Sequence, residues 1–304
     1  MTGLFARVAR LGSRSPVVRA AAALSLVITL DAVDAQTAPS FLWTVTAGQG
    51  RIYLAGSVHL LSKDYYPLSP ALEAAYRDAD LLVEEADFGD MQSPEAQLKL
   101  LTRGMLPPGQ SVDRVLREST YALVARRVAA LGMPIEPLRR FKPWMLALTL
   151  VGYEWQKAGF DAELGLDKHF FDRATADGKT VQGLETVEYQ IARLDGMTME
   201  HQDRLLAESL EDLDAERASL LELIDAWKTG DAATVERLVR ADADDDPVLY
   251  QRLLVERNRN WLARIEPLLA RKGRALVVVG AAHLVGPDGL LAMLRARGYT
   301  VDQQ

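Results

Sequence analysis

Short apolar segments of strand length occur near both ends of the chain, and helical periodicity dominates the middle. Strand character is found at 41–47, 51–58, 80–86, 179–183, 274–281 and 298–302. Apolar positions at helical spacing occupy 69–79, most of 94–132, 143–158, 163–177, most of 186–272 and 287–297. Strands that alternate with helices in this way predict an α/β fold. We expect a central mixed or parallel β-sheet flanked by helices, with a helical middle subdomain.

Local signals mark several of the boundaries. The Gly48-Gln49-Gly50 segment between the first two strands predicts a hairpin. Ser69 followed by Pro70 predicts the start of a helix, because serine caps helix N-termini and proline suits the first turn. No linker divides the chain after residue 35, so we expect one domain over 36–304 with a helical insertion at roughly 93–272.

The first 35 residues have the pattern of an export signal. Residues 1–19 contain four arginines and no acid, and the apolar run 20–30 is too short for an ordinary membrane-spanning helix. Small residues follow at Val33 and Ala35. This order predicts a signal peptide over 1–35 and a periplasmic or secreted product without a stable membrane span after cleavage. An amphipathic helix or an uncleaved anchor is the alternative.

Charge and cysteine content narrow the possible chemistry. The 304-residue chain has 35 Lys and Arg against 42 Asp and Glu, a net charge of −7, which argues against nucleic acid as a partner. It contains no cysteine, which excludes disulfides, thiolate nucleophiles and cysteine-bound zinc. Any metal must therefore be bound by Asp, Glu or one of four histidines.

Two distant segments share one pattern. Residues 52–64 and 276–288 each contain an apolar strand followed by Gly-x-x-His-Leu, and an aspartate lies five residues after the histidine. The matched pairs are Gly56 with Gly280, His59 with His283, and Asp64 with Asp288. Sites in α/β sheets form beyond the carboxyl ends of the strands, so both histidines are expected in one crevice. Two imidazole nitrogens suit one divalent cation, although each histidine on its own is equally typical of a turn.

Acidic residues follow two of the other predicted strands. Strand alternation places Glu85 and Asp87 on one face and Glu84 on the other. Glu185 comes just after the strand at 179–183. Acids at the end of a buried strand are unusual unless they are paired or bind a ligand. The alternatives are solvated loop acids and, for Glu185, an acid favoured by a helix N-terminus.

A second acidic group lies on the helix predicted at 163–177. Glu163 and Asp167 share a helical face, and with Asp161 and His169 they form either a metal patch or, as we prefer, a solvated acidic face. His201 has the context of an exposed helix residue and receives no role.

Arg257 lies next to Asn258 on an amphipathic helix. An arginine there could bind a carboxylate or stabilise an oxyanion, and a surface ion pair is the simpler reading. The sequence has no His-Glu-x-x-His, no Gly-x-Ser-x-Gly and no P-loop, so these hydrolase and nucleotide-binding classes are excluded.

Taken in order, these motifs resemble the TraB/GumN family, which includes PrgY-like and Tiki-like proteins. The resemblance covers about 41–302 and depends on both Gly-x-x-His segments, the Glu85 strand end, and the segments around Asp167, Glu185 and Arg257-Asn258. It implies a fold related to erythromycin-esterase-like hydrolases. The Tiki-like branch implies metal-dependent proteases with paired Gly-x-x-His motifs and a glutamate.

Carried onto this chain, the resemblance assigns His59 and His283 as the motif histidines and selects Glu85 over Glu84. We therefore expect a secreted metal-dependent hydrolase, a peptidase, with His59, Glu85 and His283 binding Mn, Co or Zn. Glu185 is the second choice of carboxylate ligand, and the carboxylate that does not bind the cation would take the proton from water. Arg257 would stabilise developing negative charge. A metal-free mechanism with a histidine as the base is the alternative. The substrate would be a peptide or another small extracytoplasmic molecule. The rival functions are a non-catalytic protein that binds a peptide or saccharide, and a structural partner in an envelope complex.

Overall fold

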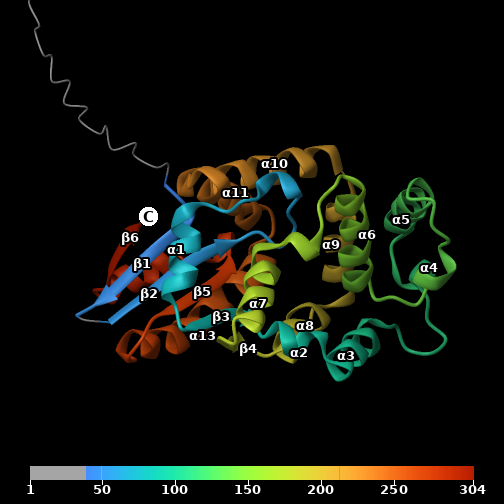
Figure 1. The fold of residues 1–304 in the computed structure, drawn as a ribbon. Coiled ribbons are helices and arrows are strands. Elements are labelled where there is room, and N and C mark those ends of the chain that lie inside the picture. The colour runs from blue at the N-terminus through green and yellow to red at the C-terminus, as the bar shows by residue number, and fades with distance from the viewer. Residues whose placement is uncertain (1–38, 49, 212) are drawn as a thin grey trace, which may run out of the picture. The chain divides into compact units, whose positions relative to one another are not determined.

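A mixed β-sheet lies at the centre of the part of the chain that the computed structural model describes, residues 39–48, 50–211 and 213–304 (Figure 1). Its six strands are β1 (Leu42–Ala47), β2 (Gly50–Ser57), β3 (Leu81–Ala86), β4 (Thr180–Glu185), β5 (Ala275–Gly280) and β6 (Thr300–Gln303). Their order is β4-β3-β5-β2-β1-β6, with β2, β5, β3 and β4 parallel and β1 antiparallel to both neighbours. The predicted α/β class and all six predicted strand positions are confirmed, whereas the predicted signal peptide lies outside the described residues.

The apolar or polar composition of each strand matches its position in the sheet. Every residue of β5 is buried, because this strand lies between β3 and β2 and its run of valines is covered on both faces. The edge strands β4 and β6 alternate or are mostly exposed. The last strand, β6, lies at one edge of the sheet, next to β1.

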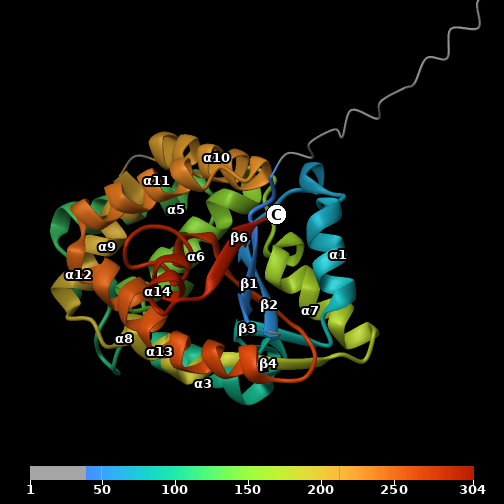
Figure 2. The same ribbon diagram turned by 90° about the vertical axis from the view of Figure 1, so that its left-hand side faces the viewer.

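Helices cover both faces of the sheet. They are α1 (Pro70–Asp78), α2 (Phe88–Gln92), α3 (Pro94–Gly104), α4 (Val112–Val115), α5 (Glu118–Ala130), α6 (Pro143–Lys157), α7 (Leu166–Ala176), α8 (Val187–Asp195), α9 (Met199–Glu211), α10 (Leu213–Thr229), α11 (Ala232–Asp245), α12 (Pro247–Tyr250), α13 (Glu256–Ile265) and α14 (Leu290–Ala296). Figure 2 shows α1 and α7 on one face and α13 and α14 on the other. None of the helices in the described ranges has the length and apolar character needed to cross a membrane.

Short helical turns connect these elements. The 3-10 turns are η1 (Lys63–Tyr65), η2 (Glu136–Leu138), η3 (Ala162–Leu164), η5 (Glu266–Ala270) and η6 (Ala281–His283), and η4 (Gln251–Val255) is a π-helical turn. The largest apolar core packs around the sheet, and a second one joins α4, α5, α6 and α9. Strand β4 lies within 93–272 and divides the helices of that range into two runs.

Two helix starts show how local chemistry sets the boundaries. Ser69 caps α1 as predicted, since its hydroxyl accepts a hydrogen bond of 3.3 Å from the Leu72 N–H. The helix predicted at 163–177 begins later, at Leu166, after the turn η3. Gly165 lies between them and contacts the loop after β2, where a Cβ would be 2.3 Å from the His59 carbonyl oxygen. This close approach brings the first turn of α7 against the loop that carries His59.

Candidate active site

The two Gly-x-x-His segments lie side by side. Strands β2 and β5 are parallel neighbours, and Ser57 pairs in register with Gly280. His59 follows the end of β2, and His283 ends the turn η6 that follows β5. Because both strands point the same way, both histidines reach the same edge of the sheet.

Three predicted residues surround one point above Gly280. A Cβ placed on this glycine would lie 3.3 Å from Glu85 Oε1, 3.5 Å from His59 Nε2 and 3.5 Å from His283 Cδ2. The absence of a side chain at Gly280 therefore leaves room for a small ligand between two imidazoles and a carboxylate.

The His59 ring is oriented by an aspartate from α7. Nδ1 of His59 lies 3.0 Å from Oδ1 of Asp167, and the Ser57 hydroxyl donates to the same oxygen at 2.7 Å. The ring is 59% exposed, and the Asp167 carboxylate raises the pKa of His59 above its usual range. With Nδ1 held by a carboxylate, Nε2 faces the point above Gly280.

The His283 ring is buried and held by an amide. The Asn258 NH₂ group donates to the backbone oxygens of His283 and Asp288, at 3.2 and 2.8 Å. Its Oδ1 therefore accepts from Nδ1 of His283, at 2.7 Å. This tautomer leaves Nε2 as an acceptor, and Arg257 Nη1 donates to it at 3.2 Å. Burial lowers the pKa of His283 to about 3, so the ring is neutral near pH 7.

Arg257 connects two buried glutamates. Its Nη2 lies 2.5 Å from Glu85 Oε2 and 2.7 Å from Glu185 Oε1, and its Nε donates to that Glu185 oxygen at 2.9 Å. The Trp261 indole donates to the other Glu185 oxygen at 2.8 Å. Arg257 thus forms ion pairs with two carboxylates of the chain itself. They are not the surface ion pair of the simpler reading, because the Arg257 side chain is only 11% exposed.

Glu85 is the best compensated acid of the group. Its Oε1 accepts the Gly280 N–H at 2.8 Å, and Gln190 donates to its Oε2 at 3.4 Å. Burial is the largest single influence on Glu85 and would raise its pKa, but the Arg257 guanidinium, the two neighbouring histidines and the Gly280 N–H together outweigh burial and lower this pKa to about 2. Glu85 is therefore ionised throughout the physiological range.

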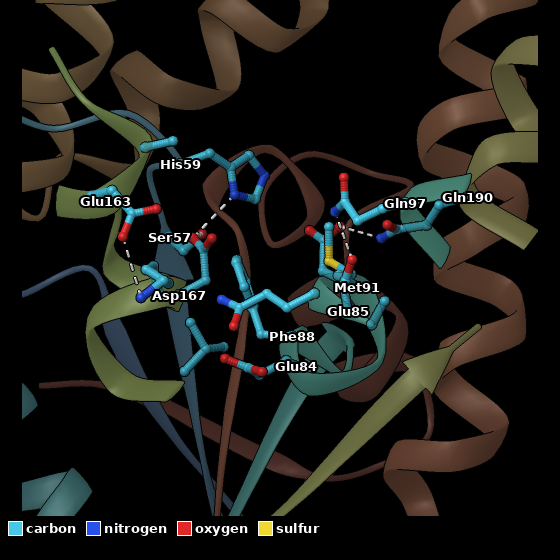
Figure 3. Close-up of a pocket in the computed structure, with 15 residues that line it drawn as sticks. Ser57, His59, Glu84, Glu85, Phe88, Met91, Gln97, Glu163, Asp167 and Gln190 are labelled. Atoms are coloured by element: carbon cyan, nitrogen blue, oxygen red, sulfur yellow. Dashed lines mark hydrogen bonds and ion pairs between the residues drawn. The ribbon is translucent and has the colours of Figure 1, made fainter. Parts of the chain in front are cut away.

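A cavity of about 420 Å³ opens beside this group. Its lining includes Ser57, His59, Glu84, Glu85, Phe88, Met91, Gln97, Asp167 and Gln190. Figure 3 shows Ser57, His59 and Asp167 on one side and Gln97 and Gln190 on the other. Polar groups on an apolar wall are typical of a small-molecule or peptide site.

The second acidic group of the sequence does not form a cluster. Asp161 caps η3, Glu163 pairs with Lys168, and the His169 ring packs against Tyr66. Of this group Asp167 alone faces His59 among the described residues. The preferred solvated acidic face is therefore wrong for Asp167, which is buried because the first turn of α7 packs against the loop after β2.

Two further expectations differ from the structure. Asp87 does not join Glu85, because its side chain caps α2 by accepting the Gly89 N–H at 2.8 Å. His201 is not an exposed residue, because its ring is half-buried and lies 2.8 Å from Asp246.

Sequence reasoning missed the supporting side chains around the histidines. Ser57 lies two residues before His59, and its hydroxyl supports Asp167. Trp261 lies four residues after Arg257, so helical spacing alone would have placed both on one face. Phe88 and Met91 carry no local signal, because they line the cavity only after α2 folds back over β3.

The donor atoms are of the kinds that bind a divalent cation, but their present spacing does not form a ligand set. Each ring is held at Nδ1 by an oxygen, which is the usual support for a histidine that binds metal through Nε2. Within the ranges that the structure describes, however, no three His, Asp or Glu side chains are close enough to form a ligand set. Arg257 contacts both Glu85 and the Nε2 atom of His283.

Residues 41–303 match the TraB/PrgY/gumN family along nearly the whole described part of the chain. The chain belongs to this family. It is 27% identical to the uncharacterized protein YbaP of Escherichia coli (strain K12) over 251 residues, which cover 82% of this chain and 89% of YbaP. The family resemblance inferred from the motifs is confirmed.

Two more distant relatives also match, and the name of one of them states a function. The chain is 22% identical to an uncharacterized protein of Treponema pallidum (strain Nichols), over 84% of this chain and 80% of that protein. It is 23% identical to metalloprotease TIKI2 of Danio rerio, over 86% of this chain and 60% of TIKI2. No solved structure matches the chain significantly.

Proposed function

We propose that this protein is a metal-dependent hydrolase of peptide bonds. The observation that carries the proposal is the meeting of His59 Nε2, Glu85 Oε1 and the His283 ring within 3.5 Å of one point above Gly280. Family membership and the name of the TIKI2 relative support it. A free cavity beside that point offers space for a peptide.

His59 and His283, through Nε2, and Glu85 would bind the cation, and nitrogen and oxygen ligands without sulfur suit Mn, Co or Zn. When bound, such a cation supplies a water of lowered pKa and polarises a substrate carbonyl. Asp167 and Asn258 hold the two rings so that both Nε2 atoms are presented. Arg257 would have to release His283 Nε2, and its freed N–H would then face developing negative charge.

Glu185 is better suited to position Arg257 than to take a proton from water. Both of its oxygens are engaged, one by the Arg257 guanidinium and one by the Trp261 indole. We assign it as a positioning residue behind the cavity, which it does not line.

A metal-dependence experiment tests this function. Purified protein would be assayed on a quenched fluorescent peptide library before chelation, after chelation and after return of Mn, Co or Zn. We expect chelation to abolish turnover and one of the metals to restore it. The His59→Ala and His283→Ala variants should lose both turnover and bound metal, whereas His201→Gln, outside the cavity, should keep both. Turnover that persists after chelation would remove the metal from the mechanism.

A non-catalytic binding protein is the second candidate, and one observation favours it. Arg257 already contacts two of the three expected ligands, which gives a stable cluster without a cation. In that case His59→Ala and His283→Ala would weaken peptide binding, and the wild-type protein would show no turnover to lose.

We also propose that the protein acts in the periplasm or outside the cell. The proposal depends on the basic, apolar and small-residue order of residues 1–35. N-terminal sequencing of the protein from the extracytoplasmic fraction should find a chain that begins near Gln36. A full-length chain in the cytoplasm would contradict it.

A further inference from the structure

Glu84 is a buried carboxyl group that faces the cavity. It is 1% exposed, and neither of its oxygens has a hydrogen-bond partner among the residues that the structure describes. It nevertheless lines the cavity, on the opposite face of β3 from Glu85. Leaving such a group without a partner costs free energy, so a group that comes from outside the chain is the natural partner.

The other charged groups on this wall are already compensated. Glu85 is paired with Arg257, Asp167 lies 3.0 Å from His59, and Glu163 lies 3.4 Å from Lys168. Lys168 also forms an ion pair with Asp172 at 2.5 Å, so two carboxylates other than Glu84 engage its ammonium. Within the described ranges, Glu84 is therefore the lining carboxyl that lacks a partner.

We infer that this part of the cavity is a subsite for a basic side chain, lysine or arginine, with Glu84 as the group that recognises it. The inference rests on the proposed function only in taking a peptide as the ligand. It adds the substrate class: peptides with a basic residue next to the reacting bond.

The shape of the wall favours a basic residue over a small cation. Ala86, Phe88, Met91 and Val278 line the cavity together with Glu84. Lysine and arginine have apolar stems that pack on such surfaces while the charged end reaches a carboxylate. A bound ammonium or guanidinium would favour the ionised form of Glu84, whereas an acidic side chain would oppose it. In the view of Figure 3, Glu84 and His59 lie at opposite edges of the cavity, so a bound peptide could contact both.

Retention of peptides on the immobilised full chain tests the inference. Four pools of randomised hexapeptides would each contain one fixed residue: lysine, arginine, norleucine or citrulline. Norleucine keeps the stem of lysine without the ammonium, and citrulline keeps the shape of arginine without the charge. Mass spectrometry would quantify retained peptides and, separately, cleavage products.

We expect the wild-type protein to retain the lysine and arginine pools about tenfold more than their uncharged counterparts, as one charge-assisted contact implies. Glu84→Gln, which keeps the shape of the side chain but cannot ionise when a basic side chain binds, should reduce this preference to within about twofold. Glu163→Gln, which removes a 73% exposed carboxylate from the same cavity, should keep the wild-type preference.

Equal retention of the lysine and norleucine pools by the wild-type protein, or retention of no pool, would overturn the subsite. So would an unchanged preference in Glu84→Gln. The wild-type comparison requires no variant, so it is independent of whether Glu84→Gln folds. Glu84-dependent retention without cleavage products would leave the subsite standing and remove the hydrolase. Cleavage of peptides without a preference for basic residues would support the hydrolase and overturn the subsite.

Discussion

At the scale of single residues, neighbouring glutamates on β3 have opposite electrostatic situations. Glu85 is surrounded by donors that, with Arg257 as the largest contributor, together overcome the effect of burial and lower its pKa to about 2. Glu84 is buried without a partner, and burial raises its pKa to about 9, with the Asp167 charge acting in the same direction. The Phe88 backbone N–H opposes this shift without reaching hydrogen-bonding geometry. Two adjacent residues of one type thus differ because strand alternation sends them to different faces.

Glu84→Gln should make the free energy of unfolding less dependent on pH. With no basic side chain bound, Glu84 has a raised pKa and keeps its proton in the folded protein, while the unfolded chain loses it. The wild-type protein therefore loses stability as the pH rises from about 4.5 to about 9. Glutamine does not titrate, so the variant should gain stability over the wild type by a few kcal/mol across that range.

Urea unfolding of both proteins at pH 5, 7 and 9 measures this difference. Glu163→Gln serves as the control, since its carboxylate is exposed. A gap between wild type and Glu84→Gln that stays constant with pH would show that Glu84 is ionised when buried.

At the scale of elements, α13 and the π-helical turn before it determine the arrangement of the site. Arg257, Asn258 and Trp261 all come from α13 and reach Glu85, Glu185 and His283. The turn η4 (Gln251–Val255) directly precedes this helix. One extra residue in a helical turn rotates the following side chains by about 100°. Such turns are frequent at functional sites, and here the turn sets which face of α13 meets the sheet.

Asn258→Ala should release the His283 ring. The variant leaves the backbone oxygens of His283 and Asp288 without their donor, at a cost of about 1–3 kcal/mol in the free energy of unfolding. It also removes the acceptor that holds the proton on Nδ1. Nitrogen-15 NMR of the imidazole should change from the Nδ1–H tautomer to a mixture.

The matched control is Asn260→Ala, two residues along the same helix. Asn260 donates to the exposed Tyr189 hydroxyl. This variant should stay within about 0.5 kcal/mol of wild type. Equal effects of the two substitutions, or an unchanged tautomer in Asn258→Ala, would refute the role given to Asn258.

At the scale of the whole molecule, the parallel strand order concentrates the site at one edge of the sheet. Strands β2, β3, β4 and β5 all end there, and they or the turns after them carry His59, Glu85, Glu185 and His283. Arg257 connects three of these segments, which lie far apart in the sequence. A single guanidinium therefore bridges three segments that no local interaction could hold together.

Arg257→Met should destabilise the protein strongly. Glu85 and Glu185 are 12% and 5% exposed, and removing their shared cation leaves two buried carboxylates uncompensated. We expect a loss of about 3–5 kcal/mol in the free energy of unfolding, measured by urea denaturation. Arg297→Met removes an exposed partner of Glu266 and should cost less than about 1 kcal/mol. If Arg257→Met cost less than about 1 kcal/mol, water would have to compensate the carboxylates of Glu85 and Glu185 in place of the guanidinium.

The elements and the pairing of the two motifs could be predicted from the sequence. Apolar periodicity located the six strands, and the repeated Gly-x-x-His pattern indicated that His59 and His283 share a crevice. Both predictions depend on rules that act along one strand or between parallel neighbours. The signal segment and the metal remain predictions.

The contacts within the site were decided by the tertiary structure. Asp167 meets His59 because Gly165 allows α7 to approach the loop after β2, and a helical repeat contains no information about that approach. Arg257 lies between two glutamates, and Glu84 faces a cavity, because helices from distant segments pack on the sheet edge. Periodicity determines which face of an element is buried, whereas the partner that buries it depends on all the elements packing at once.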